Sequence, residues 1–336
     1  MNSVLKQDIE NITKDFDMSL FEGKTVLVTG ATGLIGKICT LSLLNSGVKV
    51  VALARDIQKA ENIFGKNKNL QILIQDINKP INIDRKIDYI IHCASTTSSQ
   101  DFVQKPVETI YTTLNGTRNV LEFAKKNKIK GMVYLSSLEV YGVNKTNDDI
   151  ICYEDKLYDL DILSVRSSYP ESKRMAENMC ISYASEYNVP VKIARLSQTF
   201  GAGVSYEDNR VFAQFAKCVI NKENIILHTK GETKRNYCYT TDAICGIFTV
   251  LTKGQTAQAY NIANKNTYIS IHDMARMLEN ENTRVEFEID NKNRGYNPTV
   301  KIFLNTDKLE ALGWIPKVDL KEMFERLILS LKEDNE

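Results

Sequence analysis

The sequence predicts an α/β protein whose centre is a doubly wound parallel sheet. Runs rich in Val, Ile and Leu recur through the first half of the chain with the composition of buried parallel strands. They alternate with segments of helical periodicity, and this alternation is typical of strands joined by right-handed helical crossovers. The predicted strands are residues 25–29, 48–54, 70–75, 88–95 and 131–137.

The bulk composition narrows the class of protein. With 336 residues and a net charge of +1, the chain can bury a substantial core but has no broad electrostatic surface for nucleic acid or an anionic membrane. No apolar run approaches the roughly 18 residues that cross a bilayer, and residues 1–17 lack the apolar core of a secretory signal. Seven cysteines without CxxC spacing predict reduced thiols in the cytoplasm, and three scattered histidines predict no metal site.

The first 22 residues form a predicted helical extension. Val4, Leu5, Ile9, Ile12 and Phe16 recur at helical spacing, so we expect an amphipathic helix that packs on the body of the protein.

Three glycines follow the first strand. Gly30, Gly33 and Gly36 separate residues 25–29 from an apolar helical segment at 37–44. Glycine lets the backbone approach a pyrophosphate, whose charge then meets the N-terminus of the helix. The pattern predicts a dinucleotide site in which the turn residues contact the cofactor: Gly30, Thr32, Gly33, Leu34, Ile35 and Gly36.

The later strand ends bear on which dinucleotide binds. An acidic residue at the end of the second strand is typical of NAD sites, whereas a nearby Arg is typical of NADP sites. This strand ends in Arg55 and Asp56, so the sequence leaves both cofactors open. We expect Asp76 and Ile77 beside the adenine, and Ala94 in contact with the cofactor.

Reactive groups lie at the end of the fifth strand and in a helix that opens at residue 168. Tyr169 and Lys173 are four residues apart and share one helix face. A nearby ammonium favours the phenolate, which predicts that Lys173 lowers the pKa of Tyr169 from about 10. Tyr169 can then accept the proton of a sugar hydroxyl while hydride leaves the same carbon for the cofactor. Ser137 would hold that hydroxyl.

Taken in order, these motifs resemble those of the extended short-chain dehydrogenase/reductases, the NAD-dependent epimerase/dehydratase family that acts on nucleotide sugars. The resemblance covers about residues 23–330. Its segments are Gly30–Gly36, Ser136-Ser137, Val140-Tyr141-Gly142, Tyr169-x-x-x-Lys173, Arg195–Gly201, Lys234–Asp242, Tyr260–Ile262 and Leu312–Pro316.

The resemblance implies a Rossmann-like domain at residues 23–198, to which 237–262 return, and a smaller C-terminal α/β substrate-binding domain at 199–236 and 263–336. It implies NAD as cofactor, a nucleotide-diphosphate sugar as substrate and a homodimer. Arg235 would pair with the diphosphate, because a guanidinium fork suits phosphate oxygens. Arg210 would lie near the base, and Gln198 stands where the family has an Asn near the diphosphate.

The chain departs from the family's dehydratases after Ser137. Their Asp-Glu pair is Leu138-Glu139 here, so the acid that protonates a departing hydroxyl is missing. Sugar-nucleotide decarboxylases resemble this Ser-Glu-Val-Tyr segment more closely. Glu139 is therefore either a proton donor or base next to the sugar or an anchor for the turn.

The leading hypothesis is an enzyme that oxidises a nucleotide-linked sugar, at C4, to a transient ketone. Epimerisation needs only Ser137, Tyr169, Lys173 and room for the ketosugar to rotate, and would serve polysaccharide biosynthesis. The alternatives are decarboxylation of a UDP-uronate, as in UDP-xylose synthases, an NADPH-dependent keto-sugar reductase suggested by Arg55, and a non-catalytic cofactor-binding protein.

Overall fold

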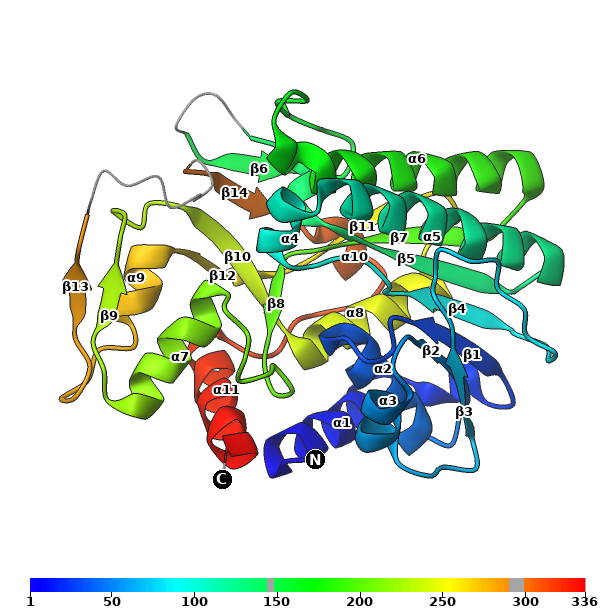
Figure 1. Ribbon diagram of the computed structural model, residues 1–336, viewed down its shortest axis with the longest axis horizontal. Coiled ribbons are helices and arrows are strands. Elements are labelled where there is room, and N and C mark those ends of the chain that lie inside the picture. The colour runs from blue at the N-terminus through cyan, green and yellow to red at the C-terminus, as the bar shows by residue number, and fades with distance from the viewer. Residues whose placement is uncertain (144–147, 290–298, 336) are drawn as a thin grey trace.

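A parallel seven-stranded sheet forms the centre of the computed structural model, which describes residues 1–143, 148–289 and 299–335. The strand order is β11-β7-β5-β4-β1-β2-β3 (Figure 1). The bounds are β1 Thr25–Thr29, β2 Lys49–Ala54, β3 Leu70–Ile74, β4 Tyr89–His92, β5 Gly131–Ser137, β7 Val191–Leu196 and β11 Ala259–Ile262. The predicted doubly wound sheet is confirmed. Its order reverses between β1 and β4, and ligands bind open α/β sheets where the carboxyl ends of such strands diverge.

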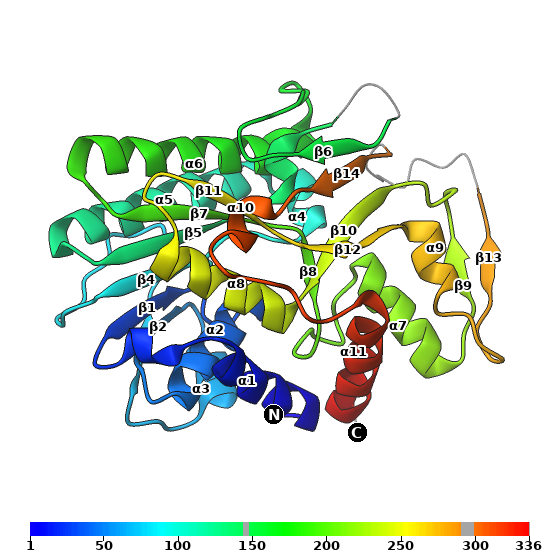
Figure 2. The ribbon, with the colours of Figure 1, turned by 180° about the vertical axis from the view of Figure 1, so that it is seen from behind.

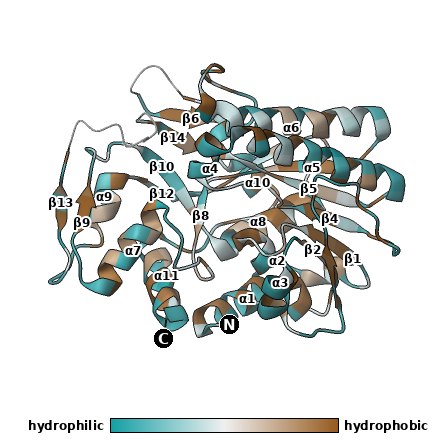
Figure 3. Cartoon of the chain, viewed as in Figure 1, coloured by the Kyte–Doolittle hydropathy of each residue, from teal (hydrophilic) through white to brown (hydrophobic). Residues whose placement is uncertain are grey.

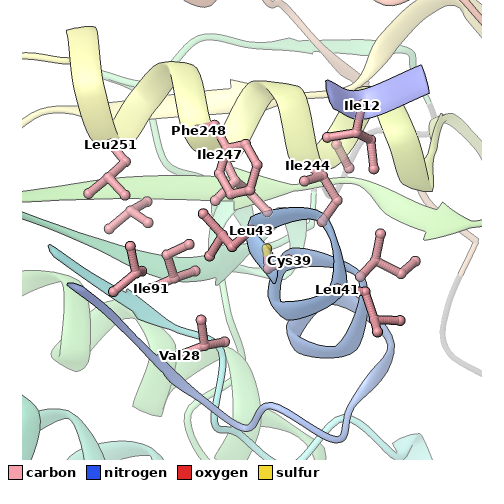
Figure 4. Close-up of a cluster of buried hydrophobic side chains, with 14 of the residues drawn as sticks. Ile12, Val28, Cys39, Leu41, Leu43, Ile91, Ile244, Ile247, Phe248 and Leu251 are labelled. Atoms are coloured by element: carbon pink, nitrogen blue, oxygen red, sulfur yellow. The ribbon is translucent and has the colours of Figure 1, made fainter. Parts of the chain in front are cut away.

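Helices cover both faces of this sheet, because successive strand residues point to opposite sides. Val28 packs with one group of helices, whereas Leu27 packs with the other. The first group is α1 Ser3–Asp15, α2 Leu34–Asn45, α3 Ile57–Phe64 and α8 Thr240–Lys253, and the second is α5 Pro106–Asn127 and α6 Ser168–Tyr187. Figure 4 shows Cys39 and Leu43 of α2 packed between Val28 and the α8 side chains. The strands β1 and β2 are largely hydrophobic, and hydrophilic residues lie on the outer face of α5 (Figure 3).

A second sheet lies beside the first, in the order β12-β10-β14-β6, with β8 paired to β10 (Figures 1 and 2). The strands are β6 Ile150–Cys152, β8 Gln198–Phe200, β10 Lys234–Tyr239, β12 Asn264–Ser270 and β14 Lys301–Leu304. A separate pair joins β9 Ile225–Leu227 to β13 Val285–Phe287. The accompanying helices are α7 Val211–Asn221, α9 Ile271–Arg276 and α11 Leu320–Asn335, whereas α10 Asp307–Glu310 packs against β11 and α8. Phe200, Phe212 and Phe324 form the centre of their core.

Three short elements complete the description near the carboxyl ends of the parallel strands. They are α4 Ser99–Gln104, the 3-10 turn η2 Leu138–Tyr141 and the 3-10 turn η3 Val165–Ser167. Another 3-10 turn, Met18–Phe21, links α1 to β1.

The N-terminal helix α1 bridges the two sheets. Its apolar residues Val4, Leu5, Ile9 and Ile12 are buried, as the spacing predicts. On the other side, the buried Asp8 accepts hydrogen bonds from Tyr239 of β10 and Arg326 of α11. The two chain ends therefore lie side by side in both views (Figures 1 and 2).

Two further observations bear on the sequence predictions. The seven cysteines are free thiols. Among the helices in the described part of the chain, none is long and apolar enough to span a bilayer.

Candidate active site

The glycine turn between β1 and α2 has no room for side chains at two of its three glycines. Gly30 has a φ of +64°, and a Cβ there would lie 2.8 Å from the backbone of Ala94. A Cβ at Gly36 would lie 2.3 Å from the carbonyl oxygen of Gly30, whereas one at Gly33 would meet this oxygen at an ordinary 3.4 Å. Glycine is therefore required for steric reasons at positions 30 and 36, whereas position 33 has room for a Cβ atom.

The N-terminus of α2 supplies hydrogen-bond donors beside this turn. Gly33 caps the helix without a side chain. Within the described residues, no acceptor bonds the backbone N–H groups of Leu34, Ile35 and Gly36. Unpaired N–H groups at a helix N-terminus form a site for an anion such as a pyrophosphate. Thr32, half-buried, lies in the same turn.

A buried network holds Ala94 against Gly30, and the sequence did not indicate it. Thr29 Oγ1 lies 2.7 Å from His92 Nδ1 and accepts a hydrogen bond from the Ala94 N–H at 3.3 Å. Burial lowers the pKa of His92 to about 3, and Lys173 adds to this shift, so the imidazole is neutral. His92 therefore supports the glycine turn through its contact with Thr29.

The end of β2 presents two different side chains. Asp56 caps α3 and accepts a hydrogen bond from the Lys59 N–H at 3.0 Å through Oδ1. Arg55 is exposed and forms no hydrogen bond or ion pair with the described residues. The residues after the next strand, β3, make local contacts. Asp76 accepts a hydrogen bond from the Asn78 N–H, and the Ile77 side chain is buried. Among the described residues, the second carboxylate oxygen of Asp56 and the guanidinium of Arg55 therefore have no hydrogen-bond partner.

Tyr169, Ser137 and Lys173 meet where β5 ends and α6 begins. The Ser137 hydroxyl lies close enough to the Tyr169 phenol to lower its pKa, and it accepts a hydrogen bond from the Glu139 N–H at 3.2 Å. The Lys173 ammonium lies 5.7 Å from the centroid of the Tyr169 ring and donates to the carbonyl oxygen of Leu135 at 2.8 Å. The structure therefore brings the predicted catalytic residues together.

The pKa of Tyr169 shifts in the opposite direction to the sequence prediction. Burial raises it, the Glu139 carboxylate adds to the rise, and Ser137 and Arg166 lower it by less. Lys173 does not lower it here, because its ammonium points to Leu135 and its own pKa falls to about 8 through burial. The phenol is consequently protonated at neutral pH.

Two residues that sequence reasoning missed cover Tyr169. Phe102 of α4 stacks on the Tyr169 ring, with centroids 4.1 Å apart, and the Arg166 guanidinium lies 4.8 Å from the centroid of Phe102. Arg166 Nη2 also pairs with Glu139 at 2.9 Å. The position of Arg166 three residues before Tyr169 was a readable signal, since that spacing is one helical turn. Phe102 lies in α4, a helix of 6 residues that was not predicted from the sequence.

The predicted substrate-binding residues lie on the second sheet and beside α7. Gln198 of β8 and Arg235 of β10 are half-buried on neighbouring strands. Arg235 has no ion-pair partner among the described residues, so its guanidinium is available to an anion. Arg210 differs, because its guanidinium already forms a bidentate pair with Asp208.

The remaining motif residues hold neighbouring elements of the fold together. Arg195 of β7 forms a bidentate buried pair with Glu177 and donates to the Tyr141 hydroxyl at 3.1 Å. The Tyr141 hydroxyl donates to Asn261 at 2.6 Å. Asp242 of α8 accepts a hydrogen bond from the Val318 N–H and so anchors the loop before α11.

Known proteins are similar in sequence over most of the chain. UDP-glucuronic acid decarboxylase 1 of Xenopus tropicalis is 26% identical over 99% of this chain and 80% of its own length. UDP-glucuronic acid decarboxylase 2 of Arabidopsis thaliana is 27% identical over 90% of this chain, which spans 66% of that relative's length, just under two thirds.

Solved structures agree on the fold. An epimerase of Methanothermobacter thermautotrophicus superposes with a TM-score of 0.80 at 21% identity, covering 99% of this chain and 96% of its own. A UDP-glucuronic acid 4-epimerase of Bacillus cereus superposes with a TM-score of 0.76 at 23% identity, covering 92% of this chain and 99% of its own.

The family model that matches is the NAD dependent epimerase/dehydratase family, over residues 26–263. These residues run from the glycine turn through Ser137, Tyr169 and Lys173 to the end of the parallel sheet. This chain is therefore an enzyme of the NAD dependent epimerase/dehydratase family.

Proposed function

We propose that this enzyme oxidises a nucleotide-diphosphate sugar at C4 to a transient ketone and then restores the hydroxyl, most simply as an epimerase. The placement of Ser137 beside the Tyr169 phenol, with Lys173 one turn further along α6, carries this proposal. It supports proton transfer to and from one sugar hydroxyl at the carboxyl end of the parallel sheet.

The cofactor side is proposed to hold NAD. The unpaired N–H groups of Leu34, Ile35 and Gly36 suit its pyrophosphate. The free oxygen of Asp56 suits a ribose hydroxyl of NAD. Arg55 could pair with the 2′-phosphate of NADP, so NADP is proposed as a weaker ligand. When bound, the nicotinamide accepts a hydride from the sugar carbon and returns it.

The catalytic residues then act on the sugar hydroxyl. Tyr169 accepts its proton as the ketone forms and donates the proton back when the hydroxyl is restored. Ser137 orients the oxygen through its own hydroxyl. A cationic cofactor close to Tyr169 would favour the phenolate and oppose the effects of burial and Glu139. Phe102 must leave the Tyr169 ring before a sugar can lie there, since the two rings are in contact.

The substrate side is proposed to comprise residues 199–236 and 263–336, with Arg235 on the diphosphate and Gln198 and Arg210 nearby. We further propose a homodimer that pairs α5 and α6, whose exposed apolar residues include Val107, Tyr111 and Met175. A cytoplasmic role in polysaccharide biosynthesis completes the proposal.

Decarboxylation is the second candidate, and the position of Glu139 favours it. Its carboxylate influences Tyr169 through charge and is held by Arg166. A ketone at C4 would weaken the bond from C5 to a carboxylate. CO2 is then released, and the electron pair of that bond moves onto the substrate, where the ketone oxygen stabilises it as an enolate. The carbanion equivalent at C5 then takes one proton, and hydride returns to C4. Several similar proteins carry the name UDP-glucuronic acid decarboxylase.

A product panel tests the proposal. Purified enzyme is incubated with UDP-, GDP-, CDP- and dTDP-sugars, and products are identified by mass spectrometry and carbohydrate NMR. We expect an epimer of equal mass or a product lighter by CO2, in either case without net consumption of NAD. Stoichiometric consumption of NADPH would instead establish a reductase and overturn the proposal.

A further inference from the structure

Arg166 occupies an unusual position among the arginines near the catalytic tyrosine. Arg195 is fully engaged by Glu177, Tyr141 and the Glu154 carbonyl. Arg174 donates to the carbonyl oxygens of Val140 and Tyr158. Both guanidiniums are therefore structural cations that hold the turns around the end of β5.

Arg166 is held much more loosely. Across the described part of the chain, Glu139 is its only hydrogen-bonded partner, reached through Nη2 at 2.9 Å. The Nη1 and Nε donors carry no hydrogen bond to these residues. The side chains of Arg166 and Glu139 are 20% and 30% exposed, so the pair is open to a ligand. A guanidinium presents five donors in a fixed fork, and one edge remains free.

The pair also lies next to the reacting position. Arg166 stands over Phe102, and Phe102 stands over Tyr169, so the guanidinium lies one aromatic ring away from the phenol. Glu139 and Arg166 are the two charged groups that act on Tyr169. In a sugar that is oxidised at C4, the carbon attached to C5 is adjacent to the reacting carbon. A sugar that took the place of Phe102 would therefore have its C5 substituent within reach of Arg166 if that substituent faced α4.

The chemistry of that group follows from charge. A neutral hydroxymethyl group would gain little from an arginine that is already paired. A carboxylate would place a second negative charge beside Glu139, and only a cation that bridges both carboxylates would make this arrangement favourable. Arg166 can bridge them, with Nη2 on Glu139 and its free edge on the sugar acid.

We propose that Arg166 is the residue that selects a nucleotide-diphosphate hexuronic acid, by binding the carboxylate on C5 of the sugar. This inference rests on the proposed function, since it requires a sugar with its C4 at Tyr169. It holds for epimerisation and for decarboxylation alike, because it concerns binding of the acid and not its later fate.

The test measures affinity for two sugars that differ only at this group. UDP-glucuronate and UDP-glucose are titrated by calorimetry into NAD-loaded enzyme that carries Tyr169→Phe, so that neither sugar is consumed. In this background we expect tighter binding of UDP-glucuronate. Arg166→Gln should weaken the binding of UDP-glucuronate by about 10- to 100-fold, the usual range for hydrogen bonds to a charged group. The affinity for UDP-glucose should be unchanged.

Two further variants separate recognition from folding. Arg166→Lys keeps the charge but loses the fork, and should give an intermediate affinity for UDP-glucuronate. Arg276→Gln, on the exposed last turn of α9, is the matched control and should change neither affinity. Equal weakening of both sugars by Arg166→Gln, or no preference for UDP-glucuronate before the substitution, would overturn the inference.

Failure of the inference is distinguishable from failure of the proposed function. Enzyme with Tyr169 intact that oxidises UDP-glucose but does not prefer UDP-glucuronate keeps the proposed function and refutes the role of Arg166. Enzyme that binds and oxidises no sugar nucleotide of either kind refutes the proposed function itself.

Discussion

The rings of Phe102 and Tyr169 stack with their centroids 4.1 Å apart and their planes 9° from parallel. Phe102 is 2% exposed and Tyr169 is 7% exposed, so each ring excludes water from the other. The carbonyl of Phe102 accepts a hydrogen bond from the Ser168 hydroxyl at 2.9 Å, which ties α4 to the start of α6. This stack explains why burial is the largest cause of the raised pKa of Tyr169.

Removing the Phe102 ring should therefore lower the pKa of Tyr169. Phe102→Ala admits water to the phenol, whereas Phe102→Leu keeps the site covered and serves as the control. The pKa is measured by ultraviolet difference titration, subtracting the matching Tyr169→Phe variant to isolate this one of 15 tyrosines. Identical titration of Tyr169 in the Ala and Leu variants would contradict the role given to burial.

The glycine turn yields a pair of substitutions with different expected effects. Gly36→Ala places a Cβ 2.3 Å from the Gly30 carbonyl oxygen and should lower the melting temperature of cofactor-free protein. Gly33→Ala meets only an ordinary contact at 3.4 Å and should fold normally. Because residue 33 caps the N-terminus of α2, the methyl group of the new alanine should still weaken NAD binding. Calorimetry of NAD binding and thermal unfolding separate the two effects, and an unchanged melting temperature for Gly36→Ala would count against this reading.

Lys173 should make stability depend on pH in the alkaline range. Burial lowers its pKa from 10.5 to about 8 in the folded protein. Below pH 8 both folded and unfolded chains carry the charge, so its burial destabilises the fold by roughly 3 kcal/mol. As the pH rises from about 8 toward 10.5, the folded lysine is neutral while the unfolded one still binds its proton, and this cost diminishes.

The comparison is with Lys173→Met, which never carries the charge. Its free energy of unfolding relative to the parent, measured with urea, should fall between pH 7 and pH 9.5. Lys49→Met, at an exposed position in β2, should show the same difference at both pH values. A difference for Lys173→Met that does not vary with pH would show that its ammonium is not destabilised by burial.

The N-terminal helix gives a prediction about stability between the two sheets. Asp8 is buried and paired with Arg326 and Tyr239. Asp8→Ala leaves the Arg326 guanidinium without its buried partner, and should reduce the free energy of unfolding by about 3 to 5 kcal/mol. Asp15→Ala, which breaks the exposed pair with Lys317 on the same helix, should change it by less than about 1 kcal/mol. Equal losses in urea unfolding would contradict the bridging role of α1.

Sequence reasoning reached the parts of the fold that depend on local periodicity. The strands at 25–29 and 131–137 coincide with β1 and β5, and the helix opening at 168 begins where α6 begins. Helix α5 starts at Pro106, a residue suited to the first helical turn. Short strands such as β8 and β6 were missed, since three residues carry too little pattern.

The site was predictable as a set of residues but not as an electrostatic arrangement. Glycine spacing and the interval from Tyr169 to Lys173 are local, and the structure brings these residues to one edge of the sheet. The direction of the Tyr169 pKa shift was wrong, because it depends on Phe102, 67 positions away in the sequence, and on the carbonyl that Lys173 faces. Contacts of that kind arise only from the folded chain.

The central claim is that Tyr169 accepts the proton of a sugar hydroxyl while hydride leaves the same carbon. Stopped-flow absorbance at 340 nm measures that step directly, when NAD-loaded enzyme is mixed with UDP-glucuronate. We predict a transient rise in absorbance for the parent protein, and a rate lower by about 10²- to 10⁴-fold for Tyr169→Phe with NAD still bound. A transient of unchanged rate in Tyr169→Phe would contradict the account.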